Sequence, residues 1–372
     1  RSALTTDTLG SKSTAIGYSA LDSQNFTTAT DSHNTAVGHL AGLSVTTGVK
    51  NNFIGSLSGD AITIGSRNVA VGTETLSTDV QGSKSTAIGQ GALFAQNFTT
   101  ATDTFNVAVG FEAGVSVTTG IRNTLIGGLA GDALTDADRN VALGYGALSS
   151  DTLGSRSVAI GNSALFYQNF TTATDTYNIA IGDRAGNNVT TGTLNTLIGG
   201  LTGDALTAAG NNTALGAYAL TTDTLGSKTT AIGNGALFSQ NFTTATDSYN
   251  TAVGHSAGVA VTTGVRNTLI GGLVGDALTD ADYNTAIGMQ SLTTDTLGSK
   301  STAIGYGTLN NQNFTTATDS NNTAVGYNAG TAVSTGTLNT FVGGTAGDAI
   351  TDGADNVALG YNSLGADTRG SK

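Results

Sequence analysis

Short apolar clusters recur along the whole chain, and a glycine follows each of them. Residues 34–38 read Asn-Thr-Ala-Val-Gly, and residues 123–127 read Asn-Thr-Leu-Ile-Gly. Gly, Asn, Asp, Ser and Thr fill the segments between the clusters, and the clusters lack helix formers such as Glu and Lys. Brief β-branched runs bounded by turn residues are typical of β-strands. The pattern therefore predicts strands of three to five residues joined by tight turns.

The clusters obey a strict long-range period. Within one period the motif glycines are spaced 21, 17, 17 and 17 residues apart, which sums to 72, and five periods cover 5 × 72 = 360 of the 372 residues. A fixed period of this kind is the signature of a stacked repeat. The segment Gln-Asn-Phe-Thr-Thr-Ala-Thr-Asp marks each period and starts at Gln24, Gln96, Gln168, Gln240 and Gln312.

Equivalent positions of the repeat carry similar residues. The position before each motif glycine is Ile, Val or Leu, and Asn34, Asn51 and Asn68 open three successive motifs. We predict that these asparagines stack as a ladder of side-chain amides. Alternation along a strand sends the aliphatic residue to one face and the middle residue of the motif to the other. Because both faces are apolar, we predict that the middle residues form an intersubunit column, with Ala36, Phe53, Ala108, Leu125 and Leu269 as examples.

These features predict an all-β fold, a parallel β-solenoid or β-roll rod of 20 turns in five 72-residue repeats. Residues 1–372 would form one continuous solenoid. A single 17-residue coil is narrow and would expose a long apolar stripe, so we expect a homotrimer. The sequence begins and ends inside the repeat, and we therefore expect it to be a segment of a longer fibre.

The motifs also resemble a known family. Ser13-Thr-Ala-Ile-Gly17 followed by Tyr-Ser-Ala-Leu, and Asn34-Thr-Ala-Val-Gly38 followed by His-Leu-Ala-Gly, are similar to the head repeats of trimeric autotransporter adhesins of the YadA type. They are also similar to the NTAxGxxAL repeats of bacterial and phage fibre proteins. The resemblance implies a left-handed parallel β-roll of three chains, displayed extracellularly at a cell surface for attachment.

Composition narrows the chemistry. The chain has no cysteine, 14 Lys and Arg residues, and a net charge of −12. The missing cysteines exclude disulfides and thiolate metal sites, and so few cations argue against nucleic-acid binding. No apolar run is long enough for a membrane-spanning helix. His33, His39 and His255 occupy variable positions, so we predict no catalytic residue, no cofactor and no enzyme activity.

Two acidic patterns remain. Asp132, Asp136 and Asp138 are a weak candidate for a Ca²⁺ site, and a solvated turn is the preferred interpretation because other copies lack the later carboxylates. Asp7 and its equivalents precede a cation, Lys12 in the first copy, by five residues, which suggests local or interchain ion pairs.

The 21-residue turn is the last candidate site. Its four extra residues should bulge from the coil, where loops often carry function. One interpretation makes the segment a contact ridge for bundling or a receptor; in the other, which we favour, each phenylalanine folds back over the coil edge. Asn25-Phe-Thr27 and its copies are also N-x-Thr acceptors for glycosylation. The ridge residues are Asn25, Phe26, Phe98, Phe170, Phe242 and Phe314.

Together these patterns predict a structural or adhesive shaft of an extracellular microbial fibre, which associates with itself and with an unknown receptor. A phage tail-fibre shaft is the alternative. An ice-binding solenoid is a minor alternative, because threonine pairs such as Thr27-Thr28 do not recur at every turn.

Overall fold

The computed structural model describes residues 2–370, and all regular secondary structure in them is β. The chain divides into two compact units between Arg184 and Ala185. One three-residue strand stands at each of the twenty motifs, so the predicted strands and all-β class are confirmed. The first unit contains β2 (Thr14–Ile16), β4 (Thr35–Val37), β5 (Asn52–Ile54), β6 (Val69–Val71), β8 (Thr86–Ile88), β10 (Val107–Val109), β11 (Thr124–Ile126), β12 (Val141–Leu143), β14 (Val158–Ile160) and β16 (Ile179–Ile181).

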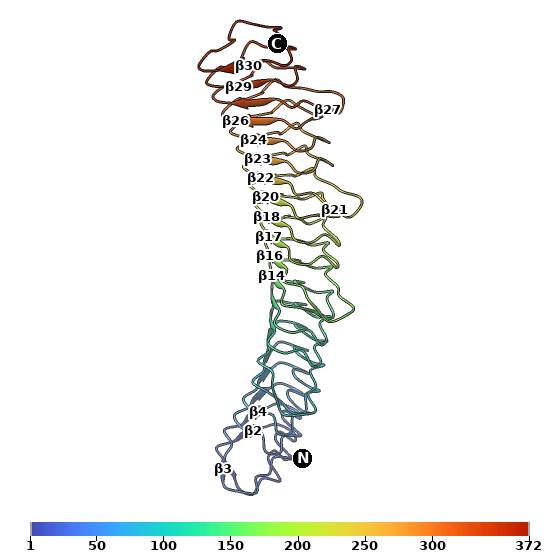
Figure 1. The fold of residues 1–372 in the computed structure, drawn as a ribbon. Helices are drawn as coiled ribbons and strands as arrows, with labels where there is room; N and C mark the ends of the chain where they lie inside the picture. The colour runs from blue at the N-terminus through green and yellow to red at the C-terminus, as the bar shows by residue number, and fades with distance from the viewer. Residues whose placement is uncertain (1, 371–372) are drawn as a thin grey trace. The chain divides into compact units, whose positions relative to one another are not determined.

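The second unit repeats this arrangement, and in both units each strand pairs in parallel with the strand of the next turn (Figure 1). Ala36 pairs with Phe53, and Phe53 pairs with Ala70, so equivalent residues lie directly above one another. This register confirms the predicted parallel β-solenoid. The strands of the second unit are β17 (Thr196–Ile198), β18 (Thr213–Leu215), β20 (Thr230–Ile232), β22 (Thr251–Val253), β23 (Thr268–Ile270), β24 (Thr285–Ile287), β26 (Thr302–Ile304), β28 (Thr323–Val325), β29 (Thr340–Val342) and β30 (Val357–Leu359).

The middle residues of the strands face the inside of the coil. Ala36, Phe53, Ala108, Leu125 and Leu269 have no exposed surface in a single chain. The predicted intersubunit column is therefore wrong, because a side chain enclosed by its own coil cannot contact another subunit. The aliphatic residues before the glycines lie outside instead, and Ile16 and Ile54 are 59% and 43% exposed. A narrow coil accommodates alanine at most turns, whereas a larger aliphatic side chain at every turn would overfill it.

Space inside the coil explains why the period is four turns. Phe53 fills the interior of its turn, and Gly59, six residues later, leaves room for it: a Cβ atom at Gly59 would lie 2.5 Å from Phe53 Cε1. In the next turn Ala70 occupies the strand position and Leu76 the later one. Leu76 has φ 53° and Gly59 has φ 59°, so volume rather than backbone conformation demands the glycine. The turn with Ala36 and Gly42 has no large side chain at either position, and its neighbours fill the space: a Cβ atom at Gly42 would lie 2.8 Å from Phe53 Cδ2 and 3.0 Å from Leu21 Cδ2.

The motif glycines allow the turns to approach one another. Gly38 has φ +149°, and a Cβ atom built there would lie 2.2 Å from the carbonyl oxygen of Gly55. Equivalent contacts recur along both units, as between Gly254 and Gly271. No side chain fits between two backbones at this distance, which is why these positions do not vary.

The predicted asparagine ladder forms, with backbone groups as its main partners. The Asn51 N–H donates to Asn34 Oδ1 (2.9 Å), and the Asn68 N–H donates to Asn51 Oδ1 (2.9 Å). Asn51 Nδ2 donates to the carbonyl oxygen of Gly65 (2.9 Å). Each buried amide therefore satisfies a backbone donor of the next turn and a carbonyl fourteen residues ahead, and it supplies bonds that the short strands cannot provide.

The inner space of a turn holds at most one large side chain, either at the strand position or six residues later. This volume rule predicts the outcome of a double substitution. Gly59→Leu should clash with Phe53, and Phe53→Ala should leave a cavity costing about 3–5 kcal/mol of unfolding free energy. Together they convert this turn to the Ala70–Leu76 type, so the double variant should recover at least half of the summed loss in urea denaturation. Additive losses would contradict the rule.

The ladder predicts a large cost for losing one asparagine. Asn51→Ala leaves the Asn68 N–H and the Gly65 carbonyl without a buried partner, at about 1–3 kcal/mol for each group. Exposed Asn162→Ala is the matched control and should change the unfolding free energy by less than about 0.5 kcal/mol. Similar losses for the two variants in urea denaturation would contradict this role.

Candidate functional site

The 21-residue turn adds a loop to the coil, as predicted. Figure 1 shows the loops that carry β21 and β27 reaching beyond the neighbouring turns. A two-residue parallel pair closes each loop; in the first copy Gly10 pairs with Thr30 and Ser11 with Asp31. The five pairs are β1 (Gly10–Ser11) with β3 (Thr30–Asp31), β7 (Gly82–Ser83) with β9 (Thr102–Asp103), β13 (Gly154–Ser155) with β15 (Thr174–Asp175), β19 (Gly226–Ser227) with β21 (Thr246–Asp247), and β25 (Gly298–Ser299) with β27 (Thr318–Asp319).

A buried carboxylate anchors the base of the loop. Asp79 Oδ1 accepts hydrogen bonds from the N–H groups of Gly82 (3.0 Å) and Phe98 (3.1 Å). Asp79 Oδ2 accepts a hydrogen bond from Gln96 Nε2 (2.6 Å). Gln96 Nε2 also donates to Ser85 Oγ (2.9 Å), while its Oε1 accepts Asn106 Nδ2 (2.9 Å). The network ties the loop to the asparagine ladder. It explains why glutamine and aspartate recur in every copy.

Burial sets the protonation of this anchor. Desolvation raises the pKa of Asp79 above the ordinary 3.8, against hydrogen bonds from Gln96, Phe98 and Gly82 that lower it. At Asp7, in the first turn, desolvation also raises the pKa, but the hydrogen bonds from Gln24, Gly10 and Phe26 together outweigh it, and the pKa is lowered. Asp7 is less enclosed than Asp79, which accounts for the opposite directions.

The phenylalanines of the predicted contact ridge fold back over the coil. Phe26, Phe98, Phe170, Phe242 and Phe314 are 4–7% exposed. The ridge interpretation is wrong for these side chains, and the alternative, in which they cover the coil edge, is confirmed. Asn25 is exposed, as are Thr27 and Thr28. These polar residues remain available for contact, and Asn25 also for glycosylation, whereas the buried rings do not.

The cation of each loop pairs with a different carboxylate from the one predicted. Lys12 Nζ lies 2.6 Å from Asp31 Oδ2. Asp7 instead accepts hydrogen bonds from the Gly10 N–H and from Gln24 Nε2. The Lys12–Asp31 pair lowers the pKa of Asp31. The same pairing recurs in Lys84–Asp103 (2.5 Å), Arg156–Asp175 (2.8 Å), Lys228–Asp247 (2.6 Å) and Lys300–Asp319 (2.5 Å).

The three aspartates of the weak Ca²⁺ candidate do not converge. Asp132 Oδ1 accepts Ser149 Oγ (2.5 Å), Asp136 Oδ1 accepts Thr119 Oγ1 (2.6 Å), and Asp138 Oδ1 accepts the Ile121 N–H (2.8 Å). Each carboxylate links its own turn to a neighbour. Within residues 2–370 no three acidic or histidine side chains are grouped closely enough to hold a metal ion.

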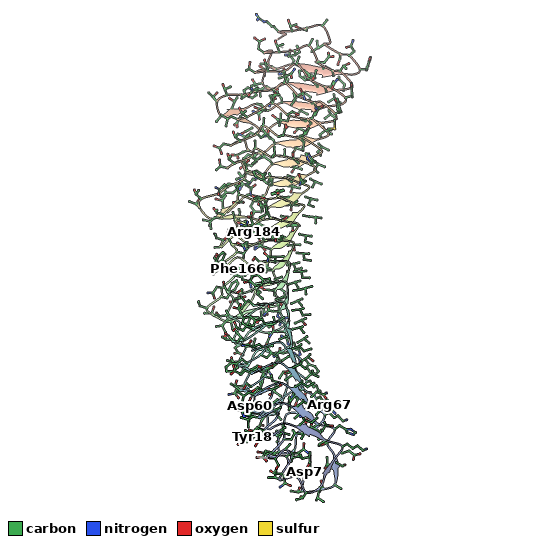
Figure 2. All side chains as sticks on the ribbon, turned by 180° about the vertical axis from the view of Figure 1, so that it is seen from behind. Asp7, Tyr18, Asp60, Arg67, Phe166 and Arg184 are labelled. Atoms are coloured by element: carbon green, nitrogen blue, oxygen red, sulfur yellow. The ribbon has the colours of Figure 1, made fainter. Side chains whose placement is uncertain are left out.

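A second surface was not anticipated from the sequence. The residue before each ladder position has a left-handed backbone conformation, with φ of 60° at Lys50, 60° at Arg67 and 61° at Arg122. Ten of the 14 Lys and Arg residues occupy this position. We call it the cation column, and in Figure 2 Arg67 lies on the strand side of the coil while Asp60 lies on the opposite side. Its ten cations are Lys12, Lys50, Arg67, Lys84, Arg122, Arg139, Arg156, Lys228, Arg266 and Lys300.

The chain matches no protein-family model, and a search of curated proteins finds no relative. In the part of the chain that the structure describes, no helix is long and apolar enough to cross a membrane.

The anchor predicts a pH dependence with a defined sign. The pKa of Asp79 in the folded chain is raised, so its protonated form adds to the free energy of unfolding. This contribution is complete below pH 3.8 and is lost as pH rises through the folded pKa. The advantage of the wild type over Asp79→Asn in urea midpoint should therefore be larger at pH 4 than at pH 7. An advantage that grows with pH would contradict the raised pKa.

Proposed function

We propose that this chain is a structural shaft of an extracellular microbial fibre, with attachment or bundling along its sides. The in-register stacking of equivalent turns supports the proposal. Each turn presents the same outer positions at the strand spacing of about 4.8 Å. Such a surface suits spacing and repeated weak contacts, whose combined strength exceeds that of any single contact.

We further propose that the shaft is a homotrimer whose chains pack through the outer face of the strands. This face carries Thr or Val at the first strand position, except for Asn52 and Ile179, and Ile, Val or Leu at the third. Leu143, Leu215 and Ile270 are among its exposed aliphatic residues. A continuous exposed apolar stripe of this kind favours association with another protein surface. The aliphatic column thus replaces the enclosed Ala/Leu/Phe column as the proposed contact.

A phage tail-fibre shaft is the alternative within the same class, and the same coil serves both. Ice binding gains support from one observation. In the second unit threonine occupies the first strand position of nine successive turns, from Thr196 to Thr340, in unbroken register. A threonine at every turn beside an aliphatic column has the regularity that an ice face requires. A trimer packed through this face would cover the array, so the two functions are mutually exclusive here.

Oligomeric state tests the shaft proposal. The wild type should have a trimeric mass in light scattering, and Leu215→Lys with Ile270→Lys should give a folded monomer, because two charges would enter a desolvated interface. Leu194→Lys with Leu338→Lys is the control: both leucines are exposed and lie in the cation column, outside the strands, and the trimer should persist. A monomeric wild type that shows thermal hysteresis would contradict the shaft and favour ice binding.

A further inference from the structure

The distribution of cations in this acidic protein is strongly uneven. In the first unit the cation column holds Lys or Arg at seven of ten successive turns, and the remaining positions are His33, Phe105 and Tyr177. In the second unit only three of ten positions are cationic, namely Lys228, Arg266 and Lys300. A chain with net charge −12 therefore carries a basic stripe, interrupted at three turns, along one edge of its first unit.

Backbone hydrogen bonds hold these residues in line. The Lys50 N–H donates to the Ser32 carbonyl (2.7 Å), and the Arg67 N–H donates to the Val49 carbonyl (3.0 Å). Bonds from the N–H groups of Arg122 (2.8 Å) and Arg139 (3.0 Å) to the preceding turn repeat the pattern. Successive side chains of the column are therefore offset by one strand spacing, about 4.8 Å.

The fold itself does not require cations at these positions. The same left-handed conformation is adopted by Phe105 (φ 52°), Leu194 (φ 60°), Asn211 (φ 60°) and Asp355 (φ 61°). Like charges at neighbouring strand positions destabilise a sheet. A column of cations therefore weakens the isolated fold, unless an anion lies along it.

Four cations of the stripe are available for such an anion. Lys84 and Arg156 pair with loop aspartates, whereas no ion pair joins Lys50, Arg67, Arg122 or Arg139 to any of residues 2–370. These four side chains are exposed. They form two adjacent pairs in the stack, separated by Lys84 and Phe105.

Two aromatic rings stand within the stripe. Lys84 Nζ lies 4.9 Å from the ring centroid of Phe105, and Arg156 Cζ lies 5.5 Å from that of Tyr177. Both rings are about half exposed, at 48% and 49%. A half-exposed ring in such a stripe is a surface on which the C–H face of a sugar packs, while the acidic groups of neighbouring sugars meet the four cations without an ion pair.

We propose that the stripe from Lys50 to Tyr177 binds a linear acidic polysaccharide of the polyuronate class. A sugar unit of an extended polysaccharide is about as long as one turn of the coil, so the carboxylates that face the stripe lie in register with its cations. The arginines bind carboxylates through two parallel hydrogen bonds. The stripe is a property of the folded first unit, whether or not the chain forms a fibre.

The surrounding charge favours a polyuronate over a nucleic acid. Asp103 and Asp175 lie beside the stripe in their ion pairs, and the whole chain is acidic. A densely charged phosphate polymer would be repelled by these groups more strongly than a polymer with one carboxylate per sugar.

Binding to polygalacturonate tests the proposal. The full chain should bind the immobilised polymer at low ionic strength, more weakly at 0.15 M salt, and should not bind neutral dextran. Replacing Lys50, Arg67, Arg122 and Arg139 with Asn, a residue that this column already contains, should weaken binding roughly tenfold or more. Phe105→Asn with Tyr177→Asn should weaken binding without changing its salt dependence.

A control variant with the same net charge, but with its substitutions outside the stripe, separates the effect of where the cations lie from the effect of total charge. Replacing Arg184, Lys228, Arg266 and Lys300 with Asn also changes the net charge from −12 to −12 − 4 = −16, and it should alter binding by less than about twofold. Melting temperatures show whether the variants fold. If the quadruple variant of the stripe does not fold, the double variant Arg122→Asn with Arg139→Asn takes its place. The proposal is overturned if the wild type does not bind polygalacturonate, if both quadruple variants lose equal affinity, or if oligothymidylate binds more tightly. Each of these results leaves the oligomer test of the shaft unaffected.

Discussion

The structure of each unit depends on the parallel pairing of each turn with the next in unbroken register. The pairing fixes equivalent residues one strand spacing apart, so any property of one position becomes a property of a whole column. A column of small residues inside, a column of amides beside it and a column of glycines at the corner are each required for the backbones to approach. Insertions cannot be absorbed within the coil, and the four extra residues of the 21-residue turn therefore leave it as a loop.

The interior of the coil is the main limit on sequence. It is too narrow for a large side chain at both inner positions of one turn: Phe53 stands with Gly59, Leu76 stands with Ala70, and neighbouring turns fill the space beside Gly42. Buried polar groups complete the interior. The amide of Asn51 satisfies backbone groups of two turns, and the carboxylate of Asp79 holds the base of the loop against the cost of its own desolvation.

Period and composition were enough to predict the strands, their parallel stacking, the asparagine ladder and the projecting loop. Period and composition do not predict which face of each strand lies inside the coil. Alternation places Ile16 and Ala15 on opposite faces but does not say which face is inside, and the prediction that the middle residues lie between subunits is therefore wrong. The partner of Lys12 was also missed, because Asp31 is brought to it by the loop and is distant in sequence. Ten cations share one position of the repeat, which the sequence contains, but the net charge of the whole chain does not reveal this.

Distances between exposed positions of the first unit test the in-register coil most directly. The chain has no cysteine, so spin labels can be attached at chosen pairs such as His33 with Arg122 and His33 with Tyr177. These pairs are five and eight turns apart, and the account predicts separations of about 24 Å and 38 Å, which is about 4.8 Å per turn whether the turn has 17 or 21 residues. Separations that increase with the number of intervening residues rather than with the number of turns would contradict it.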